Sequence, residues 1–368
     1  MSKHGKILVA MSGGIDSTVA ALLLHEQGYE VIGVTMKTWD YASSGGSKKE
    51  TGCCSLDSLQ DARRVAVDLG FPHFILDLRE EFGESVIDNF VDEYLAGRTP
   101  NPCIMCNTHI KWDALYRRAK ALDCEKIATG HYAKINQSDG RFYISKAVDL
   151  NKDQSYVLWG LTQDCLQKTM FPLADLIKPD VRKIAFDRGY ADLSKKSESY
   201  EICFIPDNDY RSFLKRRAPE KLDQLNRGMF VDKEGNILGE HDGYPFFTIG
   251  QRKGLGMAFG KPMFVAEIKP ETNVVVLADD QEMSSSFMEV GKPNWQKYSS
   301  VDDSTEFTTK IRYKDPGQAS FVHALSEAIK VEFIGPVKSI APGQSAVVYE
   351  GDDVVCGGII RQNIPGLF

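Results

Sequence analysis

Two cysteines that could do chemistry stand two residues apart in TPNPCIMCNTHIKW, residues 99–112. The C-x-x-C spacing of Cys103 and Cys106 is shared by zinc clips and by thiol–disulfide redox pairs. A zinc site needs two further ligands, and the adjacent Cys53 and Cys54 would chelate one ion poorly because neighbouring side chains point apart. A redox pair is expected to open a helix after a strand, whereas this segment is predicted to be a Pro-rich loop after a helix. A single reactive thiol with a neighbour is the third interpretation, and the spacing alone does not choose.

The stretch AMSGGIDST, residues 10–18, is a second candidate because it joins a predicted strand to a predicted helix. Gly13 and Gly14 let the backbone approach an anion closely, and the first N–H groups of the helix point toward it. Hydroxyl donors, and a carboxylate that could cap the helix or hold Mg²⁺, are supplied by Ser12, Ser17 and Asp16. The loop is neither a Walker A motif nor G-x-G-x-x-G. A plain turn is the alternative, but S-G-G-x-D-S resembles the PP-loop of ATP pyrophosphatases, which transfer AMP to a substrate oxygen.

A third cysteine with a notable setting is Cys203, in SESYEICFIPDNDY. A parallel sheet gathers loops from the carboxyl ends of several strands, so distance along the chain does not separate Cys203 from Cys106. One thiol could carry sulfur as a persulfide while the other attacks it. The apolar or turn contexts of three further cysteines favour packing roles, and these are Cys124, Cys165 and Cys356.

Composition narrows the class of protein. A chain of 368 residues is long enough for two or three domains, and it has no apolar run that could cross a bilayer. The N-terminus passes almost directly into an apolar strand, so we expect a cytoplasmic protein whose eight cysteines are kept reduced. The net charge of −7 argues against a protein that coats nucleic acid, but local basic runs remain candidate phosphate contacts at 117–120, 195–196 and 215–217.

The elements that must position these residues follow an α/β pattern over the first two hundred residues. Apolar strand-like runs alternate with helix-period segments, which predicts a parallel sheet covered by helices, with strands at 6–11, 30–36, 73–78 and 126–130 and helices at 16–28 and 57–70. The next helix is predicted to start near Asn107, just after Cys106. Beyond Cys203, short β-like runs divided by Gly turns indicate a small linking domain and a C-terminal β-barrel or sandwich.

Eight motifs in order carry a more specific resemblance: SGGIDS, TPNPCIMCN, TGHYA, KDQSYVL, ICFIP, FTIGQRKGLG, IRY and APGQSAVVY. Together they resemble the bacterial tRNA-specific 2-thiouridylase family, which makes 2-thiouridine at the wobble position of tRNA. The resemblance implies a PP-loop domain at 1–208, a small central domain at 209–280 and a C-terminal β-barrel at 281–368. It also implies an ATP-dependent sulfurtransferase that adenylates the uridine C2 oxygen and releases AMP and pyrophosphate.

The resemblance assigns roles position by position. Cys106 matches the family's nucleophile, and Cys203 matches the cysteine that carries the persulfide; reaction of the two would leave a disulfide. The ATP site would be formed by Ala10, Met11, Ser12, Gly13, Gly14, Ile15, Asp16, Ser17, Met36 and Gly130. The target base would be surrounded by Asn101, Pro102 and Cys103. Contacts to the rest of the tRNA would come from His131, Lys152, Asp153, Gln154, Arg312, Tyr313 and Gln344.

Several assignments have a structural alternative. His131 could simply form a hydrogen bond with a carbonyl, and the pair Arg312 and Tyr313 could be ordinary strand residues. Trp39 and Tyr132 could line the path of a target base that leaves the anticodon stack, but both are more readily core residues. Cys103 departs from the family, in which many members have Asp at this position. A neutral thiol cannot reproduce a carboxylate, so a general-base role there is in doubt.

The cofactors and partners implied are ATP, Mg²⁺, tRNA and a protein that donates persulfide sulfur, either a cysteine desulfurase or a relay, and no membrane is implied. An iron–sulfur cluster on Cys103, Cys106 and Cys203 is a further hypothesis, with one iron open to sulfide. A resident metal ion is not otherwise expected. Two rival functions remain: a PP-loop ligase that needs no persulfide cysteine, and a non-catalytic or zinc-stabilised RNA-binding protein.

Overall fold

The computed structural model describes residues 3–39, 55–196, 202–205 and 207–363. Contacts divide the chain into two compact units. The first contains Met1–Val86, Cys103–Asp209 and Asp352–Val354, and the second contains Ile87–Pro102, Tyr210–Gly351 and Val355–Phe368. Cys53 and Cys54, considered above as zinc ligands, lie outside the described residues. Each unit is described here by itself.

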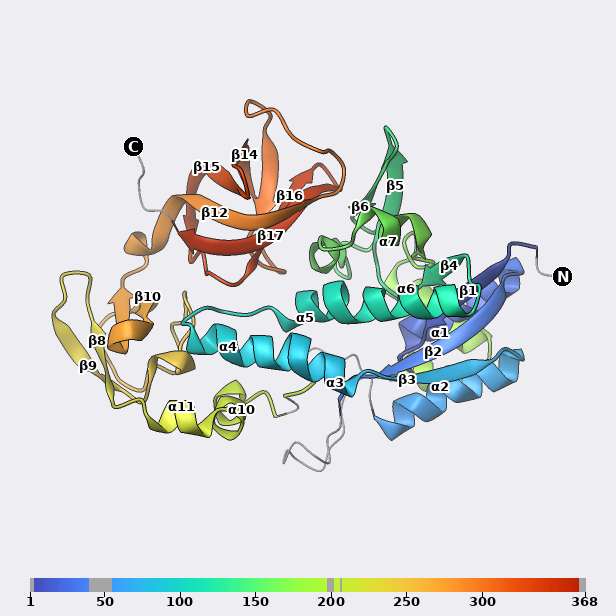
Figure 1. The fold of residues 1–368 in the computed structure, drawn as a ribbon, viewed down its shortest axis with the longest axis horizontal. Coiled ribbons are helices and arrows are strands. Elements are labelled where there is room, and N and C mark those ends of the chain that lie inside the picture. Colours follow the sequence, from blue (N-terminus) through green and yellow to red (C-terminus); the bar gives the residue numbers. More distant parts are fainter. Residues whose placement is uncertain (1–2, 40–54, 197–201, 206, 364–368) are drawn as a thin grey trace. The chain divides into compact units, whose positions relative to one another are not determined.

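A five-stranded sheet, ordered β3-β2-β1-β4-β7, forms the centre of the first unit (Figure 1). All its described pairings are parallel, and its strands are β1 (Lys6–Ala10), β2 (Glu30–Lys37), β3 (His73–Asp77), β4 (Lys126–Ala128) and β7 (Thr169–Met170). The parallel α/β sheet predicted from alternating strand and helix patterns is confirmed. After Lys6, the central strand β1 is apolar and buried because helices cover both faces of such a sheet.

The order of the strands creates a switch point beside β1. The chain moves outward from β1 through β2 to β3, and then returns to place β4 on the other side of β1. Since parallel crossovers are right-handed, the helices that follow the first two strands lie on one face, and the helix that directly precedes β4 lies on the other. Ligands of open α/β sheets bind in the crevice at the carboxyl ends of the strands at such a point.

The helices of the first unit begin and end where local chemistry requires. Helix α1 (Ile15–Gln27) buries Val19 and Leu24 and ends at Gly28, whose φ of 94° suits glycine. Helix α2 (Leu56–Leu69) begins with a Ser55 side-chain cap. The other helices are α3 (Arg79–Phe82), α6 (Trp112–Ala121), α7 (Gln163–Lys168), α8 (Lys178–Asp187) and α9 (Ala191–Lys195), with a 3₁₀ turn η4 at Ser155–Leu158 and a hairpin of β5 (Lys134–Ser138) and β6 (Arg141–Ser145).

One predicted boundary is wrong. The helix expected to start near Asn107 starts at Pro102: α5 (Pro102–Met105) runs into the π-helical turn η3 (Cys106–Lys111) and then into α6. Proline is tolerated at the first position of a helix because that N–H has no intrahelical partner. Cys106 is therefore already one turn inside helical structure.

The second unit carries two sheets. A four-stranded sheet, ordered β10-β11-β8-β9, contains β8 (Gly228–Val231), β9 (Ile237–His241), β10 (Phe264–Lys269) and β11 (Val274–Ala278). Helices α4 (Asn89–Leu95), α10 (Tyr210–Arg217) and α11 (Pro219–Asp223) belong to the same unit; the π-helical turn η2 (Gly83–Asp88) leads into α4. Tyr94 of α4 stacks on Tyr210 of α10 at 4.8 Å between ring centroids.

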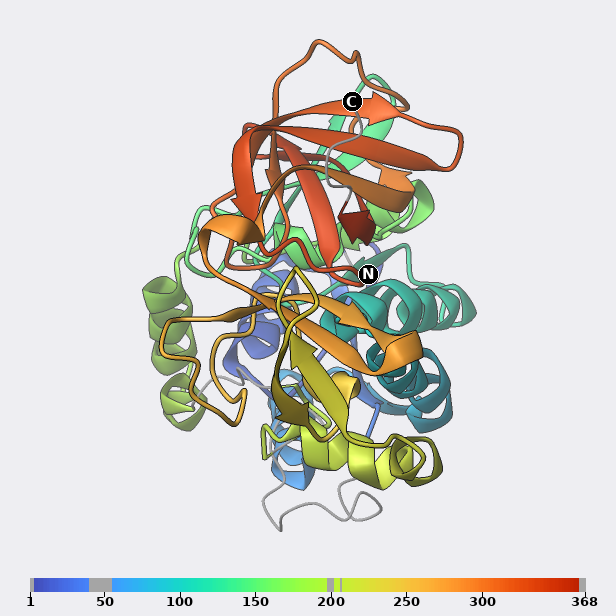
Figure 2. The same ribbon diagram turned by 90° about the vertical axis from the view of Figure 1, so that its left-hand side faces the viewer.

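A β-barrel follows, as predicted. Within residues 284–363, strand pairing continues around a closed ring, because β12 pairs with both β15 and β17 (Figures 1 and 2). Its strands are β12 (Ser284–Trp295), β13 (Phe307–Lys310), β14 (Gln318–Ala324), β15 (Ala328–Lys338), β16 (Ser345–Glu350) and β17 (Asp353–Asn363). Val290, Val322 and Val348 are buried in its core. In the described parts of the chain, we find no helix that is long and apolar enough to cross a membrane.

Candidate active site

The predicted phosphate loop leaves β1 and enters α1, and its own hydroxyls fix its shape. The Ser12 N–H donates to Ser17 Oγ at 3.1 Å, and Ser17 Oγ donates to the Gly14 carbonyl at 3.0 Å. The Met11 carbonyl accepts a 2.6 Å hydrogen bond from Thr35 Oγ1 on β2. The start of α1, whose first N–H groups lack intrahelical partners, is thereby held ready for an anion.

Two glycines allow very close packing around this loop. Gly13 has a φ of +69°, and a Cβ there would lie 1.9 Å from the Ser58 carbonyl oxygen of α2. A Cβ on Gly130, just beyond β4, would lie 2.7 Å from the Ser17 nitrogen. Met36 lies near the carboxyl end of β2. The residues predicted to bind ATP thus come from the carboxyl ends of β2, β1 and β4, which are adjacent strands of the sheet.

Asp16 does not cap α1, which has no side-chain cap bond. Its carboxylate instead accepts two hydrogen bonds from Lys178 Nζ, at 2.7 and 2.8 Å, and one from the Tyr132 hydroxyl at 2.7 Å. Lys178 is 7% exposed and Tyr132 is 2% exposed, so both belong to the interior.

Sequence reasoning missed Lys178 beside the loop and named Lys196 only as part of a short basic run. Besides Lys178, Lys196 places its ammonium 3.0 Å from the Asp61 carboxylate and 3.3 Å from the Gly13 carbonyl oxygen. Nothing in the sequence links these residues to a loop more than 150 positions away. The only local signal was the Lys195–Lys196 pair, which had been considered for phosphate contact.

The segment of Cys106 is held by neighbouring elements of the first unit. Cys106 is 9% exposed, and the next side chain, Asn107, donates from Nδ2 to the Val157 carbonyl of η4 at 3.2 Å. A Cβ on Gly160 would lie 2.2 Å from Thr108 Oγ1, so η3 and the chain after η4 approach closely. Such packing fixes the position of the thiol relative to its backbone neighbours.

Cys203 lies in a short turn in which the Ile205 N–H donates to the Ile202 carbonyl. The adjacent Phe204 is buried and packs against Phe82 of α3, with ring centroids 5.8 Å apart. Helix α3 also contacts η3, which begins at Cys106. The structure therefore places the two cysteine-bearing segments around one short helix. Trp39 contacts Phe204 as well, at 6.2 Å, in an aromatic cluster.

Two groups of the first unit have shifted pKa values. Surrounding protein atoms raise the pKa of the Cys103 thiol, with Lys111 acting in the opposite direction, although the side chain is exposed. Desolvation lowers the pKa of His131 well below its ordinary value, and Lys111 lowers it further. His131 Nδ1 lies 2.7 Å from Thr129 Oγ1, and its ring lies 5.3 Å from that of Trp112. These contacts show that His131 has a structural role; its predicted contact with tRNA stays a prediction.

The segment that holds Lys152, Asp153 and Gln154 joins β6 to η4. Two of these side chains bond within the chain: Asp153 accepts from the Ala147 N–H and from the Ser155 hydroxyl, and Gln154 Oε1 accepts from the Tyr132 N–H at 3.0 Å. In the second unit, Gln344 Nε2 donates to the carbonyls of Thr99 and Pro100, directly before Asn101 and Pro102. These three side chains therefore hold backbone segments in place.

The motif IRY is not part of a strand. Strand β13 ends at Lys310, and Ile311 is buried while Arg312 and Tyr313 are exposed in the bend that follows. The alternative of an ordinary strand pair is therefore wrong, and both side chains are accessible to a ligand.

Within the part of the chain that the structure describes, no group of three or more His, Cys, Asp or Glu side chains could hold a metal ion. Cys103, Cys106 and Cys203 are all described residues, so their thiols do not fit an iron–sulfur cluster in this arrangement.

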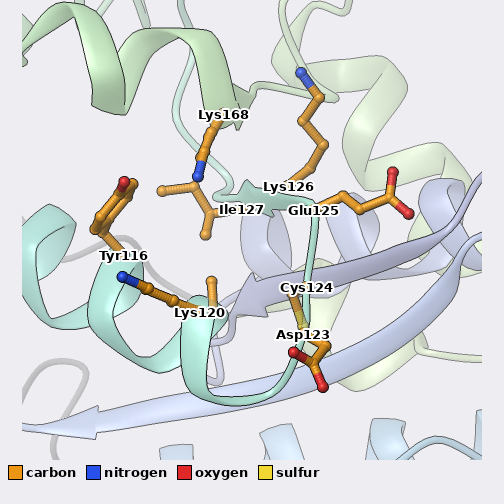
Figure 3. Close-up of a pocket in the computed structure, with 9 residues that line it drawn as sticks. Tyr116, Lys120, Asp123, Cys124, Glu125, Lys126, Ile127 and Lys168 are labelled. Carbon is orange, nitrogen blue, oxygen red and sulfur yellow. The ribbon is translucent and has the colours of Figure 1, made fainter.

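A pocket of about 210 Å³ lies at the opposite end of β4 from Gly130 (Figure 3). It is lined by both signs of charge, including Lys120, Lys168 and Asp123, and none of the predicted site residues lines it. The phosphate loop, rather than this pocket, remains the candidate site.

Comparison with known proteins agrees with the architecture. Three family models match in succession: the tRNA methyl transferase HUP domain over residues 5–207, the tRNA methyl transferase PRC-barrel domain over 211–279, and the aminomethyltransferase beta-barrel domain over 285–360. A protein of Cytophaga hutchinsonii named tRNA-specific 2-thiouridylase MnmA is 58% identical over 364 residues, which cover 99% of each chain. The chain belongs to the tRNA-specific 2-thiouridylase family.

Other members of this 2-thiouridylase family are similar at comparable length. The relative from Amoebophilus asiaticus is 59% identical and covers 98% of this chain and 96% of its own. That from Salinibacter ruber is 52% identical, with the same two coverages. The four-stranded sheet of the second unit thus corresponds to the PRC-barrel model, and the β-barrel corresponds to the beta-barrel model. The five-stranded parallel sheet corresponds to the HUP model.

Proposed function

We propose that this protein is an ATP-dependent tRNA sulfurtransferase that converts the wobble uridine to 2-thiouridine. Family membership over nearly the whole chain carries the proposal, because the relatives named above are tRNA-specific 2-thiouridylases. The S-G-G-x-D-S loop at the carboxyl edge of β1 supports ATP as the activating substrate. The domain boundaries at 208/209 and 280/281 and the cytoplasmic location stay predictions.

Activation of the uridine is the first step of the proposed mechanism. The C2 oxygen attacks the α-phosphorus of ATP, forming the O–P bond as pyrophosphate leaves. The N–H groups at the start of α1, with the hydroxyls of Ser12 and Ser17, meet the charge that develops on the phosphates. Mg²⁺ would enter with ATP and neutralise phosphate charge. Asp16 is the loop carboxylate that could hold the ion while Lys178 stays bonded, because each carboxylate oxygen can accept more than one partner.

Sulfur transfer is the second step. A donor protein leaves a persulfide on Cys203, and the Cys106 thiolate attacks the Cys203 Sγ, which releases hydrosulfide and forms a 106–203 disulfide. Hydrosulfide then attacks C2 and AMP leaves. In the second route the terminal persulfide sulfur attacks C2 and AMP leaves; the Cys106 thiolate then attacks the Cys203 Sγ of the adduct, which breaks the S–S bond, leaves the sulfur on C2 and forms the same disulfide. Both routes need a dithiol reductant to return two electrons to the disulfide.

Binding of the tRNA requires the wobble base to leave the anticodon stack. We propose that Asn101, Pro102 and Cys103 surround the base. The exposed Arg312 and Tyr313, with Lys152, are suited to contact phosphate or an exposed base. Asp153, Gln154 and Gln344 act by holding the segments that make contact, and His131 contributes a neutral ring.

The product assay tests the proposal directly. The protein is incubated with unmodified tRNA transcript, ATP, Mg²⁺ and a persulfide-generating cysteine desulfurase with cysteine, and the nucleosides are then separated by mass spectrometry. We expect 2-thiouridine at the wobble position, with one AMP formed per product. Reactions without ATP are the control. Thiolation that continues without ATP, or complete turnover in a Cys203→Ser variant, would instead favour another activity.

Iron content provides a separate prediction. Because the three thiols do not form a metal-binding group, protein purified without oxygen should show no absorbance band near about 400 nm, where iron–sulfur clusters absorb. Iron and acid-labile sulfide are measured on the same sample. A stoichiometric cluster that is lost in Cys103→Ser would contradict the prediction.

A further inference from the structure

The segment 146–158 is connected both to the segment of Cys106 and to the phosphate loop. It contains Lys152, Asp153 and Gln154, proposed above to serve tRNA binding. At its end, the Val157 carbonyl accepts from Asn107, beside Cys106. Two further connections run from the same segment to Asp16 in the phosphate loop. All these residues lie in the first unit.

The first connection runs through Lys178. Asp149 is 8% exposed, and its Oδ2 accepts a 2.9 Å hydrogen bond from the Lys178 N–H at the start of α8. The residue before α8, Ile177, has no capping side chain, so Asp149 supplies that function from another segment. The side chain of Lys178 then reaches the Asp16 carboxylate. One residue thus joins the two segments, by its backbone at one end and its ammonium at the other.

The second connection runs through Tyr132. Its backbone is clamped to Gln154 at both groups: Tyr132 N–H donates to Gln154 Oε1, and the Gln154 N–H donates to the Tyr132 carbonyl at 2.8 Å. Its hydroxyl donates to Asp16 Oδ1, which also accepts from Lys178 Nζ. Two independent connections from one segment therefore meet on the same carboxylate oxygen.

We propose that Tyr132 and Lys178 are positioning residues that couple occupancy of the 147–154 segment by tRNA to the geometry of the ATP loop. The inference rests on the proposed function for the identity of the two ligands. Asp16 is the second residue of α1, so Tyr132 and Lys178, by holding its carboxylate, act on the helical turn whose N–H groups would meet the phosphates. The buried ammonium has a strong preference for this carboxylate, because an unpaired buried charge is costly. A displacement of Asp149 or Gln154 by bound RNA is thereby transmitted to α1.

Coupling is measured as the ratio of the affinities of an ATP analogue with and without bound tRNA. The dissociation constant of α,β-methylene-ATP, which cannot release pyrophosphate, is determined with Mg²⁺ in the absence and in the presence of saturating tRNA transcript. Couplings between two sites are typically about 5-fold to 150-fold, and we expect tRNA to strengthen analogue binding at least about fivefold in the wild type. Reciprocity requires the analogue to strengthen tRNA binding by the same factor.

Two variants and one matched control isolate the connections. Tyr132→Phe removes only the hydroxyl from a buried ring, and we expect its coupling ratio to fall by more than half. Lys178→Met keeps the length of the side chain without its charge, and its ratio should approach one; Lys178→Arg should restore part of it. Tyr190→Phe removes a hydroxyl from the same buried cluster, away from Asp16, and should retain the wild-type ratio. Urea unfolding of each variant shows that it is folded.

The outcomes separate the coupling from the reaction. A wild-type ratio of one, or an unchanged ratio in both Tyr132→Phe and Lys178→Met, overturns the coupling even when 2-thiouridine is formed. A ratio that falls in both variants and not in Tyr190→Phe supports it. Because the ratio comes from binding alone, the absence of 2-thiouridine when the same wild-type preparation is assayed with ATP and the sulfur donor would overturn the proposed reaction without affecting this result.

Discussion

Replacement of Cys106 by serine should abolish formation of 2-thiouridine, by at least about a thousandfold, which is the scale of loss for a nucleophile. Serine occupies nearly the same volume at this buried site, but its hydroxyl is not ionised near neutral pH and cannot attack a persulfide sulfur. The ATP analogue and tRNA should still bind within about threefold, because Asn107 continues to anchor η3. Product is quantified by nucleoside mass spectrometry.

A matched control comes from the same unit. Cys165 is half-buried in α7 and does not belong to the proposed site, so Cys165→Ser should retain wild-type turnover. Cys203→Ser should lose product as completely as Cys106→Ser, since either change prevents the disulfide. Normal turnover by Cys106→Ser would show that the thiol is not required. The rival hypotheses, a PP-loop ligase that transfers no sulfur or an RNA-binding protein, would then be preferred.

The sequence predicts the elements around the proposed ATP site, because their signals are local. Apolar runs of the right length identify β1 and β2, Gly28 marks the end of α1, and two glycines mark a loop that approaches an anion. Parallel strands then force Met36 and Gly130 to the same edge as the loop, so a topological rule predicts their convergence. No knowledge of side-chain packing is needed for these steps.

Local sequence signals did not predict that a helix starts at Pro102. Two prolines and Asn101 were taken as loop signals, but a proline is equally suited to the first position of a helix, and only the packing of the following residues decides. The π-helical turn that begins at Cys106 has no sequence signature of its own. As a result the cysteine expected just before a helix lies inside one.

The network around Asp16 was also beyond sequence reasoning. Lys178 is 162 positions away, and a lysine at the start of a helix is ordinarily a solvated residue. Its burial depends on the docking of α8 against α1, which is a property of the folded unit. The assignment of Asp16 as a cap was local and therefore failed, because a long-range ion pair competes better for the carboxylate.

Replacement of Gly13 by alanine should weaken binding of α,β-methylene-ATP by at least about tenfold, or roughly 1.4 kcal/mol. Gly13 and Gly70 have nearly the same left-handed backbone, with φ of +69° and +74°. Alanine therefore carries a similar backbone penalty at both positions, about 1–2 kcal/mol. At Gly13 the new methyl group would also lie 1.9 Å from the backbone oxygen of Ser58, which cannot rotate away. The loop or α2 must then move.

Gly70→Ala is the matched control, because no atom lies within 4 Å of the position of its added Cβ. It should lose about 1 kcal/mol of unfolding free energy in urea and keep its affinity for the analogue. The difference in affinity between the two variants thus measures the steric requirement of the phosphate loop, separated from the conformational preference of glycine. Equal affinities in Gly13→Ala and Gly70→Ala would mean that the ATP phosphates do not depend on this close approach, and the loop would lose its assigned role.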